Sequence, residues 1–361
     1  MKVALLHYWL TNMRGGENVL AEFCRLYPTA DIFTHAWNPQ SVTVPFSGHH
    51  IQESFVGKLP GARKNCQKYL PLMPSAMQRW DFSGYDLLLS SESGPVKGIR
   101  KPENTVHICY CHTPMRYLWD MYEDYYHNTG MVGKIAMTMF KYYLRNYDLK
   151  SASCVDYFIA NSNFVRERIE RIYHRDAIVI YPPVDFDFYH AGNYSVRDYY
   201  LFVGQLIPYK RADLAVAACR KLRRKLVVIG SGPMKDELQQ STDDCVVFAG
   251  RISNQEMRQY YAEARALIFP GIEDFGIVPL EAQAAGAPVI ALGIGGALET
   301  VKENETGLFF PEATVESLMD AILRFEAGTW NREICGAQAA LFSPAVFRRK
   351  ISDFILASIK R

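Results

Sequence analysis

Two glutamates eight positions apart, Glu273 and Glu281, flank the start of a predicted helix in the segment 271–291, GIEDFGIVPLEAQAAGAPVIA. The apolar run before this segment has the length of a buried strand, and Pro279 suits the first turn of the helix that follows. Amide groups at the start of a helix carry partial positive charge and bind phosphate. The segment therefore predicts a phosphate site with neighbouring carboxylates that bind sugar hydroxyl groups.

The backbone amides expected at this phosphate are those of Phe275, Gly276, Ile277 and Val278. Glycine at position 276 lets a ligand come close to the backbone. We expect Glu281, in the first helical turn, to accept hydrogen bonds from both hydroxyls of a ribose, and Glu273 to point into the same crevice. The alternative is that Glu281 only favours the helix dipole and that Glu273 is solvated.

Positive charge for such a phosphate follows other predicted strands of the second half. In FVGQLIPYKRADLAV a strand ends at Gly204, and Lys210 and Arg211 precede a helix that begins near Ala212. Two further strand ends, in VVIGSGPMKDEL and FAGRI, carry glycines, with Arg251 in the second. Each stretch alone is also consistent with an ordinary solvated loop, but their convergence at strand ends favours a site for phosphate and sugar.

In the first half of the chain, Gly15 and Gly16 follow the first predicted strand and precede a helix, which is the position of a glycine-rich turn over a phosphate. A plain tight turn explains this pair nearly as well. His112 ends the run VHICYCH before a Thr-Pro pair, which favours a substrate-facing role over a local capping role. Asp185 and Asp187 lie among prolines and aromatic residues, which favours turn chemistry over a metal site, so no metal ligand is predicted.

Short apolar runs alternate with helical patterns along most of the chain. Runs such as YDLLLSSE and APVIALGIGG are apolar on both faces and end in polar residues or glycine, as buried parallel strands do. Their alternation with helices predicts open α/β sheets, with functional groups at the carboxyl ends of the strands. A stretch rich in proline, aspartate and tyrosine at about residues 181 to 197 is expected to link two domains.

The chain has 361 residues, enough for two domains, and 49% of them are hydrophobic, enough for real cores. A net charge of +2 gives no indication of nucleic-acid binding. The eight cysteines contain no C-x-x-C pair, which disfavours zinc and disulfide frameworks. With free thiols, no export signal and no apolar stretch of about 18 residues, the sequence predicts a cytoplasmic protein.

Together these motifs resemble those of the retaining glycosyltransferases of family 4, which have the GT-B fold. The strongest match is the E-x7-E pattern at Glu273 and Glu281. The glycine pair, CHTPMRYLWD, ANSNFVRERI followed by YPPVD, and GGALETVKENETGLFF also match. The resemblance covers nearly the whole chain, and the combination of motifs is highly specific.

The resemblance implies an α/β fold with two Rossmann-like domains facing across a cleft. Residues 1–185 form the expected acceptor-side domain, and residues 186–342 form the expected nucleotide-sugar-binding domain. A C-terminal helix in residues 343–361 is expected to return to the first domain, with Pro344 at its start.

The resemblance also implies a function, the transfer of a hexose from a nucleotide sugar to a glycan acceptor with retention at the anomeric carbon. The form HTPMRYLWD is similar to that of mannosyltransferases of lipopolysaccharide and capsule assembly, so GDP-mannose is the expected donor and a lipid-linked glycan the expected acceptor. Lys210 and the helix amides are expected to stabilise the leaving diphosphate, Glu273 to hold the donor sugar, and Glu281 to hold the ribose. His112 is expected near the reacting centre. No metal or other cofactor is implied.

One position departs from the family pattern, because Gln205 stands where arginine is usual. Phosphate binding is then expected to depend on Lys210, with help from Arg211 or Arg251. This departure leaves two alternatives open. The donor is bound more weakly, or the chain is a non-catalytic nucleotide-sugar-binding or scaffold subunit. The sequence also leaves open a UDP-hexose as the donor, the function of a sugar-nucleotide epimerase and, more distantly, that of a nicotinamide dehydrogenase.

Residues 56–80 carry five basic side chains and no acidic one, interleaved with leucine, methionine and aromatic residues. This pattern predicts peripheral contact with an anionic membrane, beside the acceptor site and on the inner face of the cell membrane. The alternative is an ordinary pair of helices whose apolar face belongs to the core.

Overall fold

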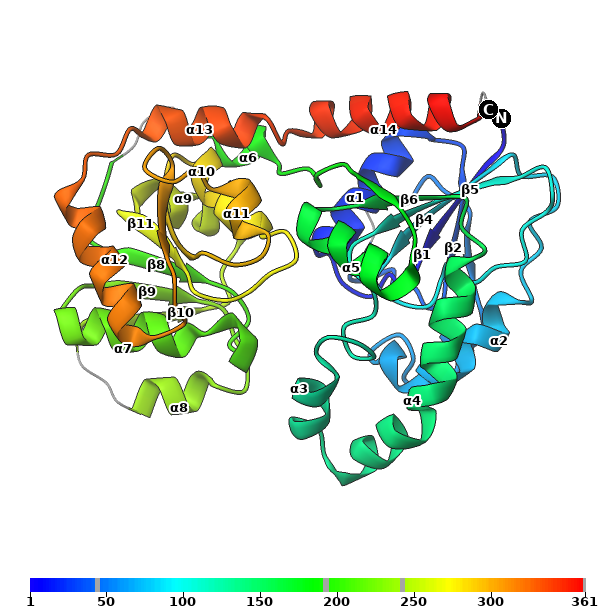
Figure 1. The fold of residues 1–361 in the computed structure, drawn as a ribbon, viewed down its shortest axis with the longest axis horizontal. Helices are drawn as coiled ribbons and strands as arrows, with labels where there is room; N and C mark the ends of the chain where they lie inside the picture. Colours follow the sequence, from blue (N-terminus) through cyan, green and yellow to red (C-terminus); the bar gives the residue numbers. More distant parts are fainter. Residues whose placement is uncertain (43–45, 191–194, 241–243, 360–361) are drawn as a thin grey trace. The chain divides into compact units, whose positions relative to one another are not determined.

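The computed structural model describes residues 1–42, 46–190, 195–240 and 244–359. Its chain divides into two compact units, unit 1 with Met1–Pro182 and Phe347–Arg361, and unit 2 with Pro183–Val346 (Figure 1). Of the predicted linker at 181–197, residues 191–194 lie outside the described residues, and so do residues 360 and 361 of the predicted C-terminal segment.

Unit 1 is built on a sheet whose seven strands are all parallel, in the order β3-β2-β1-β4-β5-β6-β7. The strands are β1 (Val3–His7), β2 (Asp31–Thr34), β3 (Ile51–Glu53), β4 (Leu87–Glu92), β5 (Val106–Cys111), β6 (Tyr157–Ala160) and β7 (Ala177–Val179). The helices of this unit are α1 (Gly15–Leu26), α2 (Met73–Met77), α3 (Tyr122–His127), α4 (Met131–Ala152) and α5 (Asn163–Tyr173), with the 3-10 helices η1 (Phe55–Lys58) and η2 (Cys66–Leu72).

Unit 2 has a second parallel sheet, of six strands in the order β10-β9-β8-β11-β12-β13. Its strands are β8 (Tyr200–Val203), β9 (Leu226–Ile229), β10 (Val246–Gly250), β11 (Ala266–Phe269), β12 (Val289–Leu292) and β13 (Gly307–Phe310). Its helices are α6 (Phe186–Tyr189), η3 (Pro208–Lys210), α7 (Ala212–Leu222), α8 (Lys235–Gln240), α9 (Asn254–Glu263), α10 (Ile277–Ala284), α11 (Ala297–Thr300), α12 (Val315–Ala327) and α13 (Arg332–Ala340).

The inner strands of each sheet are buried on both faces, because hydrophobic clusters pack on both sides of each sheet. In β4 every residue is buried, and Leu87 and Leu89 pack in one cluster while Leu88 packs in another. Successive side chains of a strand point to opposite faces, so a run apolar at every position needs a core on each side. The prediction of an α/β fold with two Rossmann-like parallel sheets is confirmed.

The last helix, α14 (Pro344–Ile359), packs on unit 1. Its residues Phe347, Ile351 and Ile355 are buried in the same cluster as Phe23 of α1. The rings of Phe347 and Phe23 are stacked with centroids 5.9 Å apart, and Figure 1 shows α14 beside α1. This contact joins the end of the chain to its first helix.

Residues 56–80 form η1, η2 and α2 rather than a pair of regular helices. Met73, Met77 and Trp80 are buried in the core of unit 1, while Leu72 is exposed. The structure therefore supports the alternative that these three side chains belong to the core. The exposed surface of the segment is basic and has little apolar area.

Candidate functional site

In unit 2 the predicted residues gather at the carboxyl edge of the sheet. Lys210 ends η3, in the loop after β8, and Glu273 lies in the loop after β11. β8 and β11 are neighbours in the sheet, so their loops leave side by side. The Lys210 ammonium forms an ion pair with Oε1 of Glu273, and both side chains are mostly buried. The structure thus brings together two residues that the sequence predicted separately.

Helix α10 starts directly after this ion pair. Gly276 is its N-cap residue and has a φ of 84°, a left-handed conformation that favours glycine. The first amides of α10, at Ile277 and Val278, precede the first hydrogen bond within the helix and are available to an anion. The loop is held in place because Gly296 N donates a hydrogen bond of 2.9 Å to the carbonyl of Glu273.

The position predicted for Glu281 within the helix was wrong. Because α10 begins at Ile277, Glu281 is its fifth residue, and no acidic residue lies in the first turn. Its carboxylate accepts a hydrogen bond of 2.9 Å from the Tyr261 hydroxyl and a second from Tyr189. Burial raises the pKa of Glu281 to about 7, and these two hydrogen bonds partly oppose that shift. The carboxylate is therefore a pre-oriented acceptor rather than a partner of the helix dipole.

The other predicted phosphate-binding side chains have different surroundings. Gln205 is exposed directly after β8. The guanidinium of Arg211 binds both carboxylate oxygens of Asp213, at 3.0 to 3.2 Å, at the start of α7. Arg251 Nε donates to Ser231 Oγ at 2.9 Å, beside the ends of β9 and β10. Among the cations predicted for the phosphate, Lys210 forms the ion pair with Glu273 that the described residues show.

In unit 1, Gly15 and Gly16 are the first two residues of α1, not a separate turn before it. A side chain at Gly16 would meet the Tyr8 hydroxyl at 2.8 Å and His112 Nε2 at 3.4 Å. Glycine at position 16 thus lets the start of α1 lie against the histidine that follows β5. The structure brings together these three predicted residues.

Sequence reasoning missed the side chains that surround His112. The strand register sets His7, the last residue of β1, beside Ser91 of β4. Ser91 Oγ lies 2.8 Å from His112 Nε2 and 3.2 Å from His7 Nδ1. His7 Nε2 in turn lies 3.6 Å from Oε1 of Glu17 on α1. His7 and Ser91 are polar residues at the ends of apolar runs, a signal that was present in the sequence.

Burial and the nearby His7 lower the pKa of His112 to about 3. The imidazole ring of His112 is therefore neutral near pH 7. In this form it can exchange hydrogen bonds with hydroxyl groups, but it does not supply a positive charge to a phosphate.

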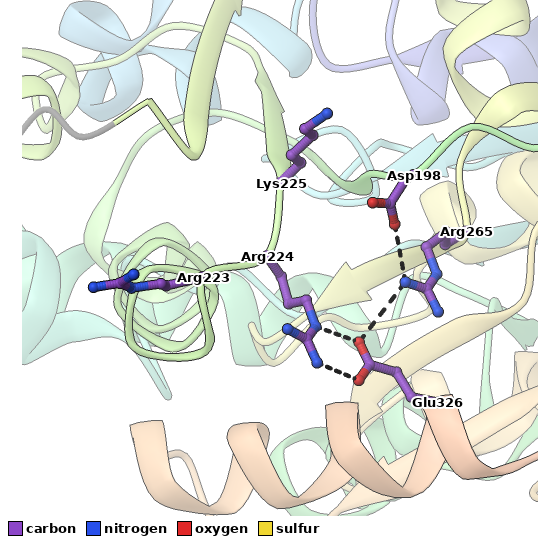
Figure 2. Close-up of a pocket in the computed structure, with 6 residues that line it drawn as sticks. All are labelled: Asp198, Arg223, Arg224, Lys225, Arg265 and Glu326. Carbon is purple, nitrogen blue, oxygen red and sulfur yellow. Dashed lines mark hydrogen bonds and ion pairs between the residues drawn. The ribbon is translucent and has the colours of Figure 1, made fainter.

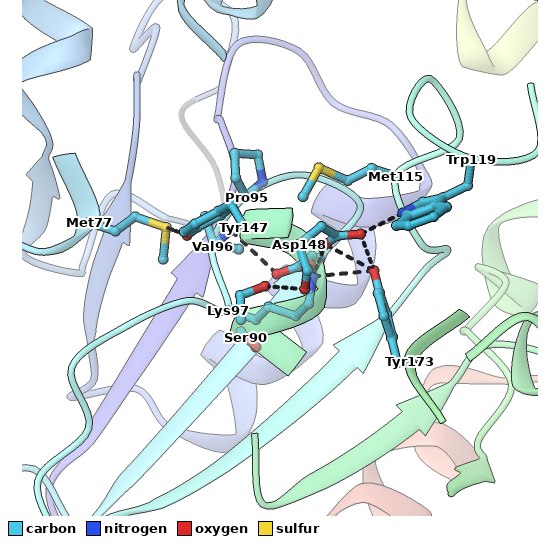
Figure 3. Close-up of polar contacts among 12 residues, drawn as sticks. Met77, Ser90, Pro95, Val96, Lys97, Met115, Trp119, Tyr147, Asp148 and Tyr173 are labelled. Carbon is cyan, nitrogen blue, oxygen red and sulfur yellow. Dashed lines mark hydrogen bonds and ion pairs between the residues drawn. The ribbon is translucent and has the colours of Figure 1, made fainter. Parts of the chain in front are cut away.

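A buried ionic cluster lies behind these strand ends (Figure 3). The ammonium of Lys97 has no exposed area, contacts Glu92 Oε1 at 2.6 Å and pairs with Asp148 of α4. Asp148 also accepts hydrogen bonds from Trp119 Nε1 at 2.7 Å and from the Tyr173 hydroxyl at 2.9 Å. The cluster ties α4 and α5 to the end of β4, whose Glu92 carbonyl accepts the amide of His112 at 2.8 Å.

A hollow of about 360 Å³ lies at the opposite edge of the sheet of unit 2, before β8, β9 and β11. It is lined by Asp198, Arg223, Arg224, Lys225, Arg265 and Glu326. Figure 2 shows Arg224 bridging to both carboxylate oxygens of Glu326, at 2.7 and 2.8 Å. Because these residues lie at the amino ends of the strands, the hollow is separate from the site around Lys210. The ion pairs fasten α12 to the sheet.

Asp185 caps the short helix α6, since its Oδ1 accepts the amide of Phe188 at 3.3 Å. This is the turn chemistry predicted for it.

In the part of the chain that the structure describes, no three His, Cys, Asp or Glu side chains are grouped so that they could hold a metal ion. Within the same ranges, no helix is both long and apolar enough to cross a membrane.

Two family descriptions match this chain. "Glycosyltransferase Family 4" matches residues 13–188, and "Glycosyl transferases group 1" matches residues 187–341. The boundary between the two matches lies close to the division between the two units.

Among curated relatives, the GDP-mannose-dependent alpha-(1-6)-phosphatidylinositol monomannoside mannosyltransferase of Mycobacterium tuberculosis is 32% identical, over 42% of this chain and 46% of its own length. A D-inositol 3-phosphate glycosyltransferase of Mycobacteroides abscessus is 29% identical, over 46% of this chain and 43% of its own length. The chain therefore matches less than half the length of each of these relatives.

Solved structures resemble the chain over its whole length. Sucrose-phosphate synthase from Thermosynechococcus elongatus superposes with a TM-score of 0.75 at 19% identity and covers 100% of both chains. Anabaena HepE in complex with UDP superposes with a TM-score of 0.73 at 16% identity, over 99% of this chain and 100% of that chain. At these identities the likeness concerns the fold.

Proposed function

We propose that this chain, whose two halves match the descriptions "Glycosyltransferase Family 4" and "Glycosyl transferases group 1", transfers mannose from GDP-mannose to a glycan acceptor with retention. The choice of donor rests on the motif HTPMRYLWD and on similarity to a relative that is GDP-mannose-dependent. A UDP-linked hexose is the competing donor.

The observation that carries the proposal is the ion pair of Lys210 and Glu273 beside the start of α10. A nucleoside diphosphate that leaves a sugar gains negative charge on its β-phosphate. Lys210 and the amides of Ile277 and Val278 would stabilise that charge, which is an electrostatic contribution to the rate. Glu273, held beside the cation, would accept hydrogen bonds from the donor sugar and position the anomeric carbon.

The bond between the anomeric carbon and the β-phosphate oxygen breaks, and a bond from the acceptor hydroxyl oxygen to that carbon forms on the same face. The departing phosphate oxygen takes the acceptor's proton, so the products are the glycoside and GDP. This route needs no protein nucleophile. A glycosidase instead needs two carboxyl groups on either side of the reacting bond, one as the acid and the other as the nucleophile or base. Here both glutamates belong to unit 2, one in the loop after β11 and one in α10.

Glu281 would bind the two ribose hydroxyls. Tyr261 and Tyr189 donate hydrogen bonds to its carboxylate and restrict its rotation. Because this side chain is already oriented, it loses less conformational entropy when the ribose binds. Gln205, Arg211 and Arg251 would contribute to diphosphate binding only secondarily, because two of them already have partners within unit 2.

His112 would contact the transferred sugar as a neutral ring, with Gly15 and Gly16 at the nearby helix start binding substrate through their amides. The proposed acceptor is a lipid-linked glycan in lipopolysaccharide or other polysaccharide assembly, reached from the cytoplasmic side of the membrane. The exposed basic side chains of residues 56–80 would face the anionic lipids there.

The deciding experiment incubates the purified protein with a panel of sugar nucleotides, with and without lipid-linked acceptors. Slow release of GDP from GDP-mannose, accelerated by an acceptor, supports the proposal. Interconversion of sugars would identify an epimerase, and binding without turnover would identify a scaffold. Calorimetry with GDP and UDP tests the base, and tenfold tighter binding of UDP, about 1.4 kcal/mol, would overturn the choice of donor.

A further inference from the structure

Helix α4 is apolar on two faces. Its inner face packs in unit 1, where Leu144 is buried with Met115 and Leu118, and Phe140 packs against them. Met115 and Leu118 belong to the segment that directly follows His112. This inner face therefore connects α4 to the candidate site.

The outer face of α4 carries large apolar side chains in the open. Met131 is 76% exposed, Ile135 54%, Met139 68% and Tyr142 79%. Their spacing of three and four residues sets them on one side of the helix, and the stripe is about 18 Å long. In Figure 1 the start of α4 lies away from the sheet of unit 1, with α3 beside it. A helix that is apolar on both sides normally has a cover on both.

Positive charge borders this stripe. From Asn128 to Tyr147 the chain has no acidic residue and three basic ones, Lys134, Lys141 and Arg145. Lys134 and Lys141 lie over tyrosine rings of α3, with distances of 5.6 and 3.8 Å from their Nζ atoms to the ring centroids. The exposed carboxylates nearest in sequence, Glu123 and Asp124, belong to α3 rather than to this face.

The stripe also has a hollow of about 260 Å³ between α3 and α4. It is lined by Tyr126, Met131, Lys134, Ile135, Thr138 and Met139. Its walls are mainly apolar and one lysine contributes to them, a combination that suits the boundary between lipid chains and anionic headgroups.

We propose that the outer face of α4 docks on the surface of an anionic lipid bilayer. Methionine, isoleucine and tyrosine side chains would enter the boundary between headgroups and acyl chains, and the bordering lysines would contact lipid phosphates. Docking through α4 would hold the segment after His112 close to the membrane, where a lipid-linked acceptor presents its glycan. The inference goes beyond the proposed function, since membrane binding requires neither the donor nor the acceptor.

Residues 56–80 have a supporting role in this arrangement. The Tyr147 hydroxyl of α4 contacts Met77 Sδ of α2 at 3.1 Å, so this segment packs against α4 through its buried side. Its basic side chains add positive charge to unit 1, but Met73, Met77 and Trp80 are buried and do not reach lipid. The apolar part of membrane binding is therefore assigned to α4.

Flotation with vesicles of phosphatidylcholine, with or without phosphatidylglycerol, tests the proposal. The full chain should float with the anionic vesicles. The double variant Ile135→Gln, Met139→Gln should bind them at least about tenfold less, because two apolar side chains leave the bilayer. A matched control, Val247→Gln with Leu323→Gln, removes side chains of unit 2 that are 57% and 48% exposed, and it should bind like the parent.

Charge is tested separately. Lys134→Gln should lower binding to anionic vesicles about fivefold and leave binding to neutral vesicles unchanged. Circular dichroism and thermal unfolding establish that the variants are folded. Equal flotation of the parent and the double variant would overturn the proposal, and so would no flotation at all. A dimer in sedimentation that the double variant abolishes, without vesicle binding, would identify a second copy as the cover instead. Hydrolysis of the sugar nucleotide in solution reports on the proposed function, and the α4 changes should not alter it.

Discussion

Ser91 Oγ lies 2.8 Å from Nε2 of His112 and joins the ends of β4 and β5 through their side chains. The same oxygen lies 3.2 Å from His7 Nδ1, and His7 Nε2 faces the Glu17 carboxylate. The Ser91 hydroxyl has one proton, so it donates to one of these two imidazole nitrogens and can accept from the other. In either direction, the bond to Ser91 holds the neutral His112 ring in one orientation.

Replacing Ser91 with alanine should therefore lower turnover about fivefold, the value of one hydrogen bond, because the His112 ring loses the bond that sets its orientation. Donor affinity, which the proposal assigns mainly to residues of unit 2, should change little. Steady-state kinetics with GDP-mannose separates kcat from KM. Ser90→Ala is the matched control, since Ser90 Oγ bonds His107 Nε2 at 2.9 Å in the core. Similar losses of kcat in both variants would mean that Ser91 acts only on stability.

Lys210→Ala should lower the rate of transfer about 100-fold, the scale of one preorganised charge at a leaving group. Glu273→Ala should lower kcat more than it lowers donor affinity. Rapid-quench or steady-state assays at saturating and at low donor measure both. The control is Lys221→Ala, which removes an exposed lysine 2.9 Å from Glu316 and should have no effect. Unchanged rates for the Lys210 and Glu273 variants would refute the assignment of the leaving-group site.

Nucleotide binding should become tighter as pH rises through about 7, because burial raises the pKa of Glu281 to about 7 and the carboxylate is the better acceptor for ribose hydroxyls. Calorimetry with GDP between pH 6 and 8 measures this trend. In Glu281→Gln the part of the trend that comes from this carboxyl should disappear, while titration of the phosphate itself remains. Parallel pH profiles for the two proteins would contradict the prediction.

The raised pKa of Glu281 also predicts how the stability of the protein changes with pH. Its pKa in the folded protein is higher than the ordinary glutamate value of 4.5, so the folded state binds more protons than the unfolded state between pH 4.5 and about 7. The contribution of Glu281 to the free energy of unfolding is therefore largest below pH 4.5 and is lost as pH rises through this window. Urea unfolding measures the free energies of unfolding of the parent and of Glu281→Gln. As pH rises from 4.5 to about 7, the parent should lose stability relative to the variant.

Transfer should survive a chelator. The proposed leaving-group site uses the Lys210 ammonium and helix amides, and Asp185 is engaged as the cap of α6. Activity in excess EDTA is the measurement, with added manganese and magnesium as controls. Loss of activity in EDTA that manganese restores would instead make Asp185 and Asp187 candidates for metal ligands.

Lys97→Met should destabilise unit 1 by about 3–5 kcal/mol, because it leaves Glu92 and Asp148 buried without their cation. Burial already raises the pKa of Glu92 to about 7. Urea unfolding measures the loss, and Lys221→Met on the surface should change stability by less than about 0.5 kcal/mol. A small effect at Lys97 would mean that the carboxylates become protonated at little cost.

The local features of this protein were readable from its sequence. Apolar runs of strand length predicted the parallel strands, since strands buried on both faces need apolar residues at every position. A helix start close to Pro279 and the loop with Lys210 followed from proline and charge in short segments, although α10 begins at Ile277, early enough to leave Glu281 outside the first turn. These features depend on neighbouring residues, so a pattern of a few residues is enough to predict them.

Contacts between distant segments were decided only by the tertiary structure. The order and register of the strands bring Ser91 beside His7 and His112, and the pairing of β8 with β11 brings Lys210 to Glu273. Sequence reasoning assigned exposed apolar residues to 56–80, whereas the structure buries Met73, Met77 and Trp80 and exposes the outer face of α4 instead. An amphipathic or apolar pattern tells which residues avoid water, but which face receives a cover depends on what the rest of the chain packs against it.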